Sequence, residues 1–96
     1  MTSYRVLLGE DAVDYLALLD AKSERIVTEN LRYLENSPFP GRGRGDKERL
    51  TVDGEEIYRM HIGRTHTAFY VIVEGRDEVR VLDIMTIDEA HKRYDA

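Results

Sequence analysis

Two arginines and two histidines between positions 59 and 66 are the residues of this sequence best suited to acid–base chemistry on a phosphate. Arg59 and His61 share one face of a predicted strand, because alternate residues of a strand point to the same side of a sheet. Arg64 and His66 fall in or just after the turn that follows. This spacing allows all four side chains to converge on the open face of a sheet.

Such a group has the functions that RNA cleavage needs. Histidine transfers protons near neutral pH, and arginine can hold a phosphate through two hydrogen bonds while it offsets charge on phosphorus. A metal site is a weaker use of these histidines, because His61 and His66 have no correctly spaced set of carboxylates nearby. The alternative for the whole group is ordinary polar decoration of a solvated sheet face.

A glycine-rich loop carries the next basic residues. Arg42 and Arg44 alternate with glycines there, and they would either contact a phosphate backbone as a mobile basic arm or stay solvated in a flexible loop. Lys47 and Arg49 follow directly, and we predict that they bind RNA together with the loop arginines.

The C-terminal segment adds two candidate groups. His91 suits the last turn of a short helix, where a positive charge complements the helix dipole. Tyr94 is predicted either to pack in the core or to stack on a base or donate a proton.

Length, composition and charge limit what the chain can be. The sequence has 96 residues, no cysteine and a net charge of −5. We therefore expect one domain over residues 1–96, without disulfides or thiolate metal sites. No apolar run approaches the roughly 20 residues that span a bilayer, and the N-terminus has no signal pattern, so we expect a cytoplasmic protein with no membrane partner. The negative charge argues against simple nucleic-acid binding, and only residues 40–66 lean basic.

The hydrophobic pattern indicates the elements that would position these residues. In chain order it predicts a strand at 4–8, helices over about 12–19 and 21–36, a return toward a strand at 46–50, strands at 57–62, 67–73 and 79–85, and a short helix at 88–94. This order predicts an α+β fold. An N-terminal strand and a helical hairpin would pack on a twisted antiparallel sheet of about four strands, with a short C-terminal helix.

Over almost its whole length the sequence resembles the RelE/ParE superfamily of toxins from toxin–antitoxin systems. The matching features are the first strand, the helical hairpin that ends in Asn36-Ser37-Pro38, the segment Asp46–Leu50, the strands Ile57–Ile62 and Phe69–Val73, and the tail His91-Lys92-Arg93-Tyr94. The resemblance implies a single RelE/ParE-like toxin domain that an antitoxin holds inactive. The RelE branch contains ribosome-dependent ribonucleases that cut messenger RNA, and the ParE branch contains inhibitors of DNA gyrase.

The resemblance also implies roles for individual positions. Arg59 and His61 match strand positions where RelE toxins often carry lysine, and Tyr94 matches an aromatic residue near the end of the chain. Two positions where the family has arginine are Thr67 and Asp88 in this sequence.

We therefore predict the toxin of a type II toxin–antitoxin pair. The favoured activity is RelE-like, ribosome-dependent cleavage of messenger RNA by attack of the ribose 2′-hydroxyl, with no metal and no cofactor. Its partners would be the cognate antitoxin, the ribosome and messenger RNA. The predicted catalytic residues are Arg59, His61, Arg64, His66, His91 and Tyr94. The alternatives are a ParE-like inhibitor of DNA gyrase and a catalytically silent relative that acts as a protein-interaction module.

Overall fold

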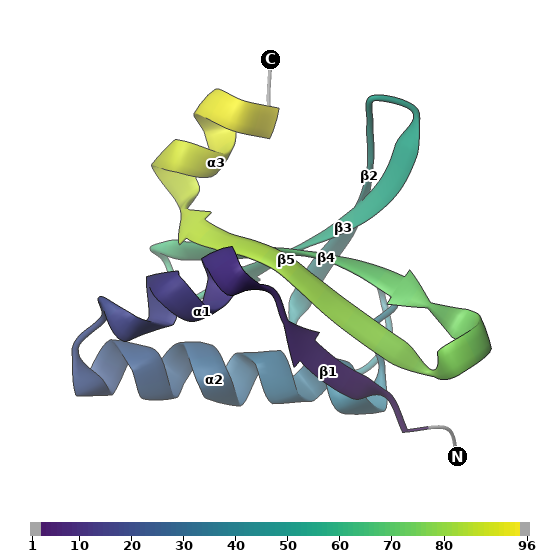
Figure 1. The fold of residues 1–96 in the computed structure, drawn as a ribbon, viewed down its shortest axis with the longest axis horizontal. Coiled ribbons are helices and arrows are strands. Elements are labelled where there is room, and N and C mark those ends of the chain that lie inside the picture. The colour runs from purple at the N-terminus through teal and green to yellow at the C-terminus, as the bar shows by residue number, and fades with distance from the viewer. Residues whose placement is uncertain (1–2, 95–96) are drawn as a thin grey trace.

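A five-stranded sheet separates two helices on one face from a third helix on the other (Figure 1). The structure is a computed structural model, and it describes residues 3–94 except for the side chain of Tyr94. The elements are β1 (Arg5–Leu8), α1 (Glu10–Ala17), α2 (Ala21–Asn36), β2 (Asp46–Val52), β3 (Glu55–Ile62), β4 (His66–Val73), a 3₁₀ turn (Glu74–Arg76), β5 (Glu78–Thr86) and α3 (Ile87–Tyr94). The predicted α+β architecture is confirmed.

The sheet has the strand order β1-β5-β4-β3-β2. Strands β2 to β5 form the expected antiparallel meander, and the segment expected to return toward a strand is a full strand, β2. The first strand differs from the prediction, because β1 lies parallel to β5 at the edge of the sheet. The helical hairpin carries the chain from the end of β1 across one face to the far edge, which leaves β1 running in the direction of β5. The sheet is therefore mixed, with one strand more than predicted.

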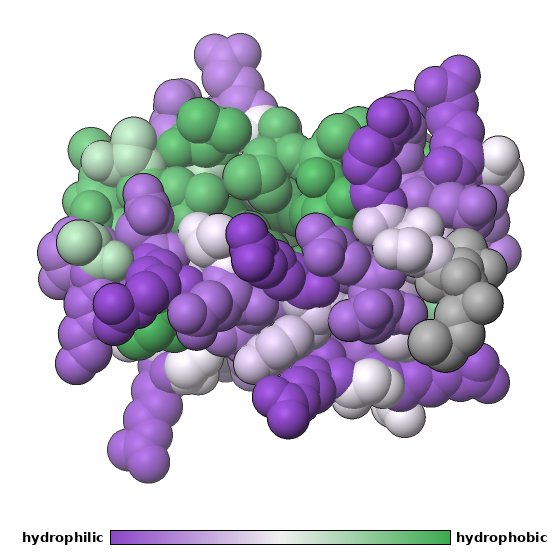
Figure 2. All heavy atoms as spheres, turned by 90° about the horizontal axis from the view of Figure 1, so that it is seen from below, coloured by the Kyte–Doolittle hydropathy of each residue, from purple (hydrophilic) through white to green (hydrophobic). Residues whose placement is uncertain are grey.

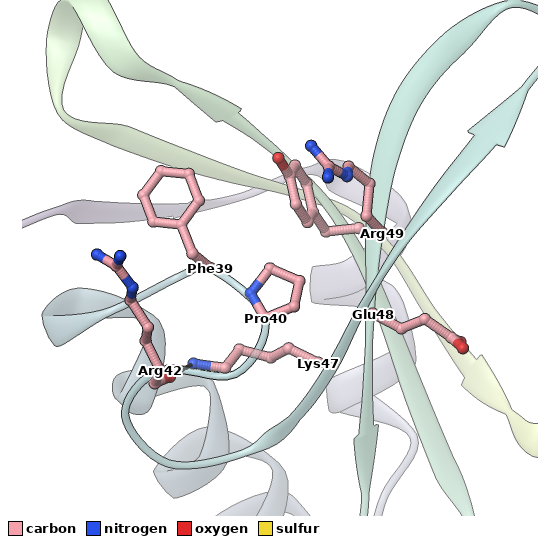
Figure 3. A pocket seen from close by; sticks show the side chains of 7 residues that line it. Phe39, Pro40, Arg42, Lys47, Glu48 and Arg49 are labelled. Atoms are coloured by element: carbon pink, nitrogen blue, oxygen red, sulfur yellow. Dashed lines mark hydrogen bonds between the residues drawn. The ribbon is translucent and has the colours of Figure 1, made fainter.

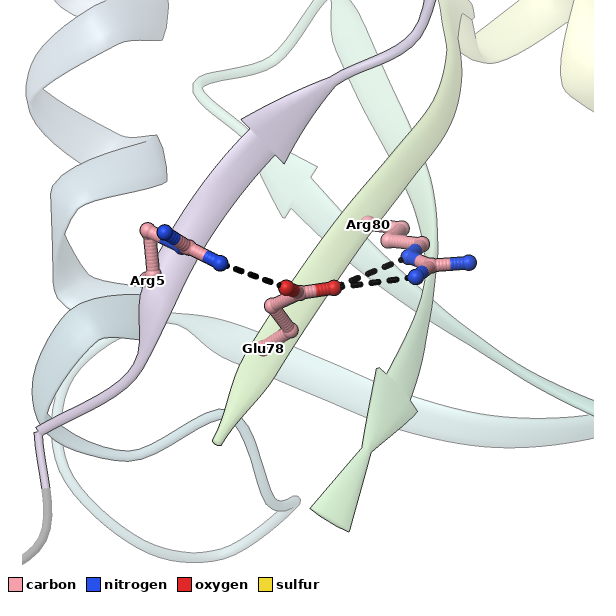
Figure 4. Close-up of polar contacts among 3 residues, drawn as sticks. All are labelled: Arg5, Glu78 and Arg80. Atoms are coloured by element: carbon pink, nitrogen blue, oxygen red, sulfur yellow. Dashed lines mark hydrogen bonds and ion pairs between the residues drawn. The ribbon is translucent and has the colours of Figure 1, made fainter. Parts of the chain in front are cut away.

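A buried carboxylate ties β1 to β5 (Figure 4). The Glu78 side chain is only 2% exposed, and it accepts hydrogen bonds from Arg5 Nη2 at 2.7 Å and from Arg80 Nε at 3.1 Å. The hydrogen bond from Arg5, together with the bond and charge of Arg80, lowers the pKa of Glu78 below its usual value. A charged carboxylate thus joins the first strand to the last.

The main core fills the space between the helical hairpin and one face of the sheet. Helix α2 begins at an N-cap, where Asp20 accepts a hydrogen bond from the Ser23 backbone at 2.7 Å, and it buries Val27, Leu31 and Leu34 at helical spacing. From the sheet, alternate residues face these helices, namely Tyr58, Met60, Ile62, Ala68, Tyr70, Val79, Val81 and Ile84. Within residues 3–94, no helix is long and apolar enough to cross a membrane.

Candidate functional site

Arg59 and His61 lie side by side on the face of the sheet that α1 and α2 leave uncovered. They alternate along β3 with Tyr58 and Met60, which point into the main core, so the pleat directs both cationic side chains to the opposite face. The strand register places Phe69 beside Arg59 and Thr67 beside His61 on this open face. The prediction that Arg59 and His61 share one face of a strand is confirmed.

Both side chains have a carboxylate neighbour on β2. Arg59 donates a hydrogen bond to Glu48, its directly paired residue, and its side chain is only 11% exposed. The Nδ1 atom of His61 lies 3.8 Å from a carboxylate oxygen of Asp46, which is also its paired residue. A phosphate that binds Arg59 must therefore compete with the carboxylate of Glu48.

A small second core forms the floor of the open face. Phe69, Met85 and Ala90 are buried together there, with Leu50 packed against them, and Ala90 brings α3 onto the sheet. The Thr67 hydroxyl is fully buried beside them and has no hydrogen-bond partner among the described residues. An ion pair between α3 and the sheet joins Arg93 Nη1 to a carboxylate oxygen of Asp83, on β5, at 3.2 Å.

His66 and Arg64 do not join this pair. His66 pairs with Ile62 across the turn, so it points to the helical face, where Nδ1 lies 2.7 Å from the Tyr15 hydroxyl of α1. Burial there lowers the pKa of His66. Arg64 is exposed in the turn itself. The expectation that all four side chains converge on the open face is wrong, because the short turn returns the chain with His66 on the side of Ile62.

The C-terminal candidates both lie on α3. His91 is exposed in its last turn, and the side chain of Tyr94 lies outside the part of the chain that the structure describes. No group of three or more potential metal ligands occurs among the described residues.

The loop cations divide into one buried anchor and three exposed groups. Lys47 is 8% exposed, and its ammonium donates hydrogen bonds to the carbonyl of Ser37, at 2.6 Å, and to the carbonyl of Arg42. Burial lowers the pKa of Lys47. The exposed Arg44 guanidinium stands 5.8 Å from the centre of the Tyr33 ring. Lys47 thus fixes the loop, and Arg42 and Arg49 line a pocket beside it.

Sequence reasoning missed the acidic members of the site, Asp46, Glu48 and Asp83, as well as Arg93. The alternation of Asp46 and Glu48 with Lys47 and Arg49 was the available signal. It could not be used without the register that places β2 beside β3.

Comparison with protein-family models and with curated proteins gives no match. Among solved structures, the chain is similar to an archaeal RelE–RelB complex from Pyrococcus horikoshii, with 25% identity and a TM-score of 0.72 over 90% of this chain and 96% of that one. It is also similar to the toxin–antitoxin complex RelBE2 from Mycobacterium tuberculosis, with 18% identity and a TM-score of 0.75 over 90% and 93% of the two chains. A YoeB/ParE toxin from Agrobacterium tumefaciens gives 18% identity and a TM-score of 0.71 over 85% and 96%.

The chain has the RelE/ParE toxin fold. The similarity covers 85–90% of this chain and 93–96% of the solved chains, so the shared RelE/ParE fold takes in most of the chain.

Proposed function

We propose that this protein is the toxin of a type II toxin–antitoxin pair and that it cleaves messenger RNA on the ribosome. The observation that supports the activity is the placement of Arg59 and His61 together on the open face of a RelE/ParE toxin fold. The protein matches solved toxin structures over almost their whole length, which supports the wider assignment. The proposal includes a single toxin domain over residues 1–96.

The proposed reaction forms one bond to phosphorus and breaks another. His61 accepts the proton of the ribose 2′-hydroxyl, whose oxygen attacks the adjacent phosphate in line with the departing 5′-oxygen. Arg59 exchanges Glu48 for a phosphate oxygen and offsets the charge of the five-coordinate phosphorus. His91 or Tyr94 donates a proton to the departing oxygen. The products are a 2′,3′-cyclic phosphate and a 5′-hydroxyl end.

The test is cleavage of a ribosome-bound message with mapping of the new RNA ends. Arg59→Ala should lower the cleavage rate about 10²–10³-fold, because it removes a cation that acts on the transition state. His61→Ala should lower it about 10²–10⁴-fold by removing proton transfer. His66→Gln changes the histidine on the opposite face. A loss as large as that of His61→Ala would show that proton transfer does not occur on the open face.

The antitoxin is proposed to cover an exposed apolar surface along β1 and the helical hairpin. Figure 2 shows apolar side chains gathered in a band along the molecule, in a view from below Figure 1. The large apolar residues that remain exposed come from β1, α1, the end of α1, α2 and β5, and are Leu7, Leu8, Val13, Leu18, Ile26 and Leu82. Apolar surface of this kind marks a protein-binding site, and β1 is also an edge strand.

This surface can be tested with the cognate antitoxin, sought as a protein that co-purifies with this one. Leu18 is 86% exposed, so Leu18→Glu should leave the fold intact while it weakens binding of the antitoxin about tenfold or more. Thr51→Glu adds the same charge on β2, away from this surface, and should leave binding unchanged. Equal binding by both variants would show that the antitoxin covers a different face.

A second candidate function is inhibition of DNA gyrase through protein contact, as in the ParE branch. The observation that favours it is the charge distribution, because the net charge is −5 and Arg59 and His61 each face a carboxylate. A negative surface opposes RNA binding but not protein binding. Purified protein that stops supercoiling by gyrase and leaves translation intact would support this candidate and exclude the ribonuclease.

A further inference from the structure

The pocket that Arg42 and Arg49 line lies on the helical side of the sheet, between the loop after α2 and the strands β2 and β3. Its volume is about 560 Å³, which is in the range of sites for small organic ligands. Apolar groups form one part of its lining and cations another. The apolar residues are Phe39, Pro40 and Tyr58, the cationic residues are Arg42, Lys47 and Arg49, and Glu48 is the acidic residue of the lining.

The apolar wall is built from aromatic rings in fixed orientations. The half-buried Phe39 ring meets Tyr4 edge-to-face at 6.2 Å and Tyr58 edge-to-face at 6.5 Å. Tyr58 in turn stacks on Tyr70 at 5.4 Å, and the Tyr70 hydroxyl donates a hydrogen bond to the carbonyl of Pro38 at 2.7 Å. These contacts hold Phe39 in place, so the wall is formed before any ligand arrives.

The cations stand around this wall (Figure 3). Arg42 and Arg49 are both exposed, and Figure 3 shows them extending from opposite sides of Phe39 and Pro40. Arg49 Nη1 lies 3.6 Å from a carboxylate oxygen of Glu56, and both side chains are exposed. Arg49 can therefore exchange Glu56 for a phosphate at little cost in free energy.

Of the other two charged residues that line the pocket, Lys47 favours an anion, and Glu48 directs its carboxylate elsewhere. The buried ammonium of Lys47 adds positive charge at the loop. Glu48 points away from Phe39 and Pro40 in Figure 3, because its carboxylate is bound to Arg59 on the other face.

We propose that this pocket binds one nucleotide of the RNA strand, with the base against Phe39 and the phosphate between Arg42 and Arg49. A flat aromatic group with an attached anion matches an aromatic wall flanked by guanidinium groups. The proposal rests on the ribonuclease function proposed above and adds a second RNA contact to it. Because Glu48 and its neighbours Lys47 and Arg49 point to opposite faces of β2, the RNA would pass over this edge strand between the two sites.

The experiment measures binding without cleavage. The probe is a fluorescein-labelled hexamer of 2′-O-methyl RNA, which has no free 2′-hydroxyl, and the protein is the full chain. The variant Arg42→Ala/Arg49→Ala should weaken binding about tenfold or more and reduce the salt dependence by about 0.7 in log K against log[salt], for the one phosphate held on a single strand. The matched control Arg25→Ala/Arg32→Ala removes the same charge from exposed positions on α2 and should change binding less than twofold.

A second variant tests the base. Phe39→Leu keeps an apolar side chain but removes the ring, and it should weaken binding about fivefold without changing the salt dependence. Equal weakening by both double variants would overturn the proposal, and so would tighter binding of a hexaglutamate peptide than of the RNA. Loss of hexamer binding by the pocket variants in a protein that does not cleave RNA would retain the pocket and reject the ribonuclease. Normal hexamer binding by those variants in a protein that does cleave would do the reverse.

Discussion

Glu48→Gln gives the sharpest test of how the open face is controlled. In the structure the guanidinium of Arg59 donates a hydrogen bond to the Glu48 carboxylate. This guanidinium is the group proposed to hold the phosphate. Glutamine keeps the size of the side chain and removes its charge. The variant should therefore bind RNA more tightly than the wild type and cleave it faster.

The size of the effect follows from the charge that is removed. Two unit charges about 4 Å apart repel each other by about 1 kcal/mol in water, and this repulsion between Glu48 and an incoming phosphate disappears in the variant. The exposed side chain of Glu48 keeps the site close to this aqueous limit. About 1 to 1.4 kcal/mol corresponds to about five- to tenfold tighter binding. Because the Arg59 side chain is only 11% exposed, loss of the ion pair should lower the free energy of unfolding by about 1–3 kcal/mol.

The assay compares hexamer binding and message cleavage for wild type, Glu48→Gln and the control Glu29→Gln. Glu29 is exposed on α2, so its variant changes the net charge equally at a distance from the site. The control should raise the affinity far less than Glu48→Gln. Unchanged or weaker binding by Glu48→Gln would refute the idea that this carboxylate competes with phosphate for Arg59.

Three further variants test the packing that supports the site. Lys47→Met should lower the free energy of unfolding by about 1–3 kcal/mol in urea titrations, because two loop carbonyls lose their donor, and an unchanged midpoint would exclude the anchor role. The pKa of Glu78 is lowered in the folded protein, so its stabilisation is present above about pH 4.5 and is lost as the pH falls. The stability difference between wild type and Glu78→Gln should therefore shrink in acid, and a constant difference from pH 7 to 3 would contradict the ion-pair account. The pKa of His66 is lowered by burial, so the wild type should lose stability as the pH falls below about 6.5. His66→Gln should have a flatter profile, and parallel profiles would show that His66 is not buried as described.

Much of the fold was predictable because local patterns determine it. The alternation at Ile57–Ile62 defined both faces of β3, and it placed Arg59 and His61 together on the open one. The helical hairpin followed from apolar spacing and from Pro38, two residues after the end of the second helix. Each of these predictions needed only the period of one element and the residues that end it.

The remaining features depend on which strands are neighbours. The sequence does not show that β1 pairs with β5, so the sheet was expected to be antiparallel with about four strands. His66 was wrongly predicted to lie on the open face. The face to which its side chain points depends on the length of the turn after Ile62, which the sequence pattern does not fix. Lys47 was expected to bind RNA, but its buried ammonium donates hydrogen bonds to two backbone carbonyls of the segment before β2. The pairing of Arg59 with Glu48 likewise depends on strand register.

The pairing of the first strand with the last has a consequence for when the molecule matures. The ion pair between Arg5 and Glu78 joins positions 73 residues apart, so β1 finds its partner only after β5 has been made. Until then the first strand has no strand to pair with. The segment that comes first in the sequence thus completes the sheet late in folding.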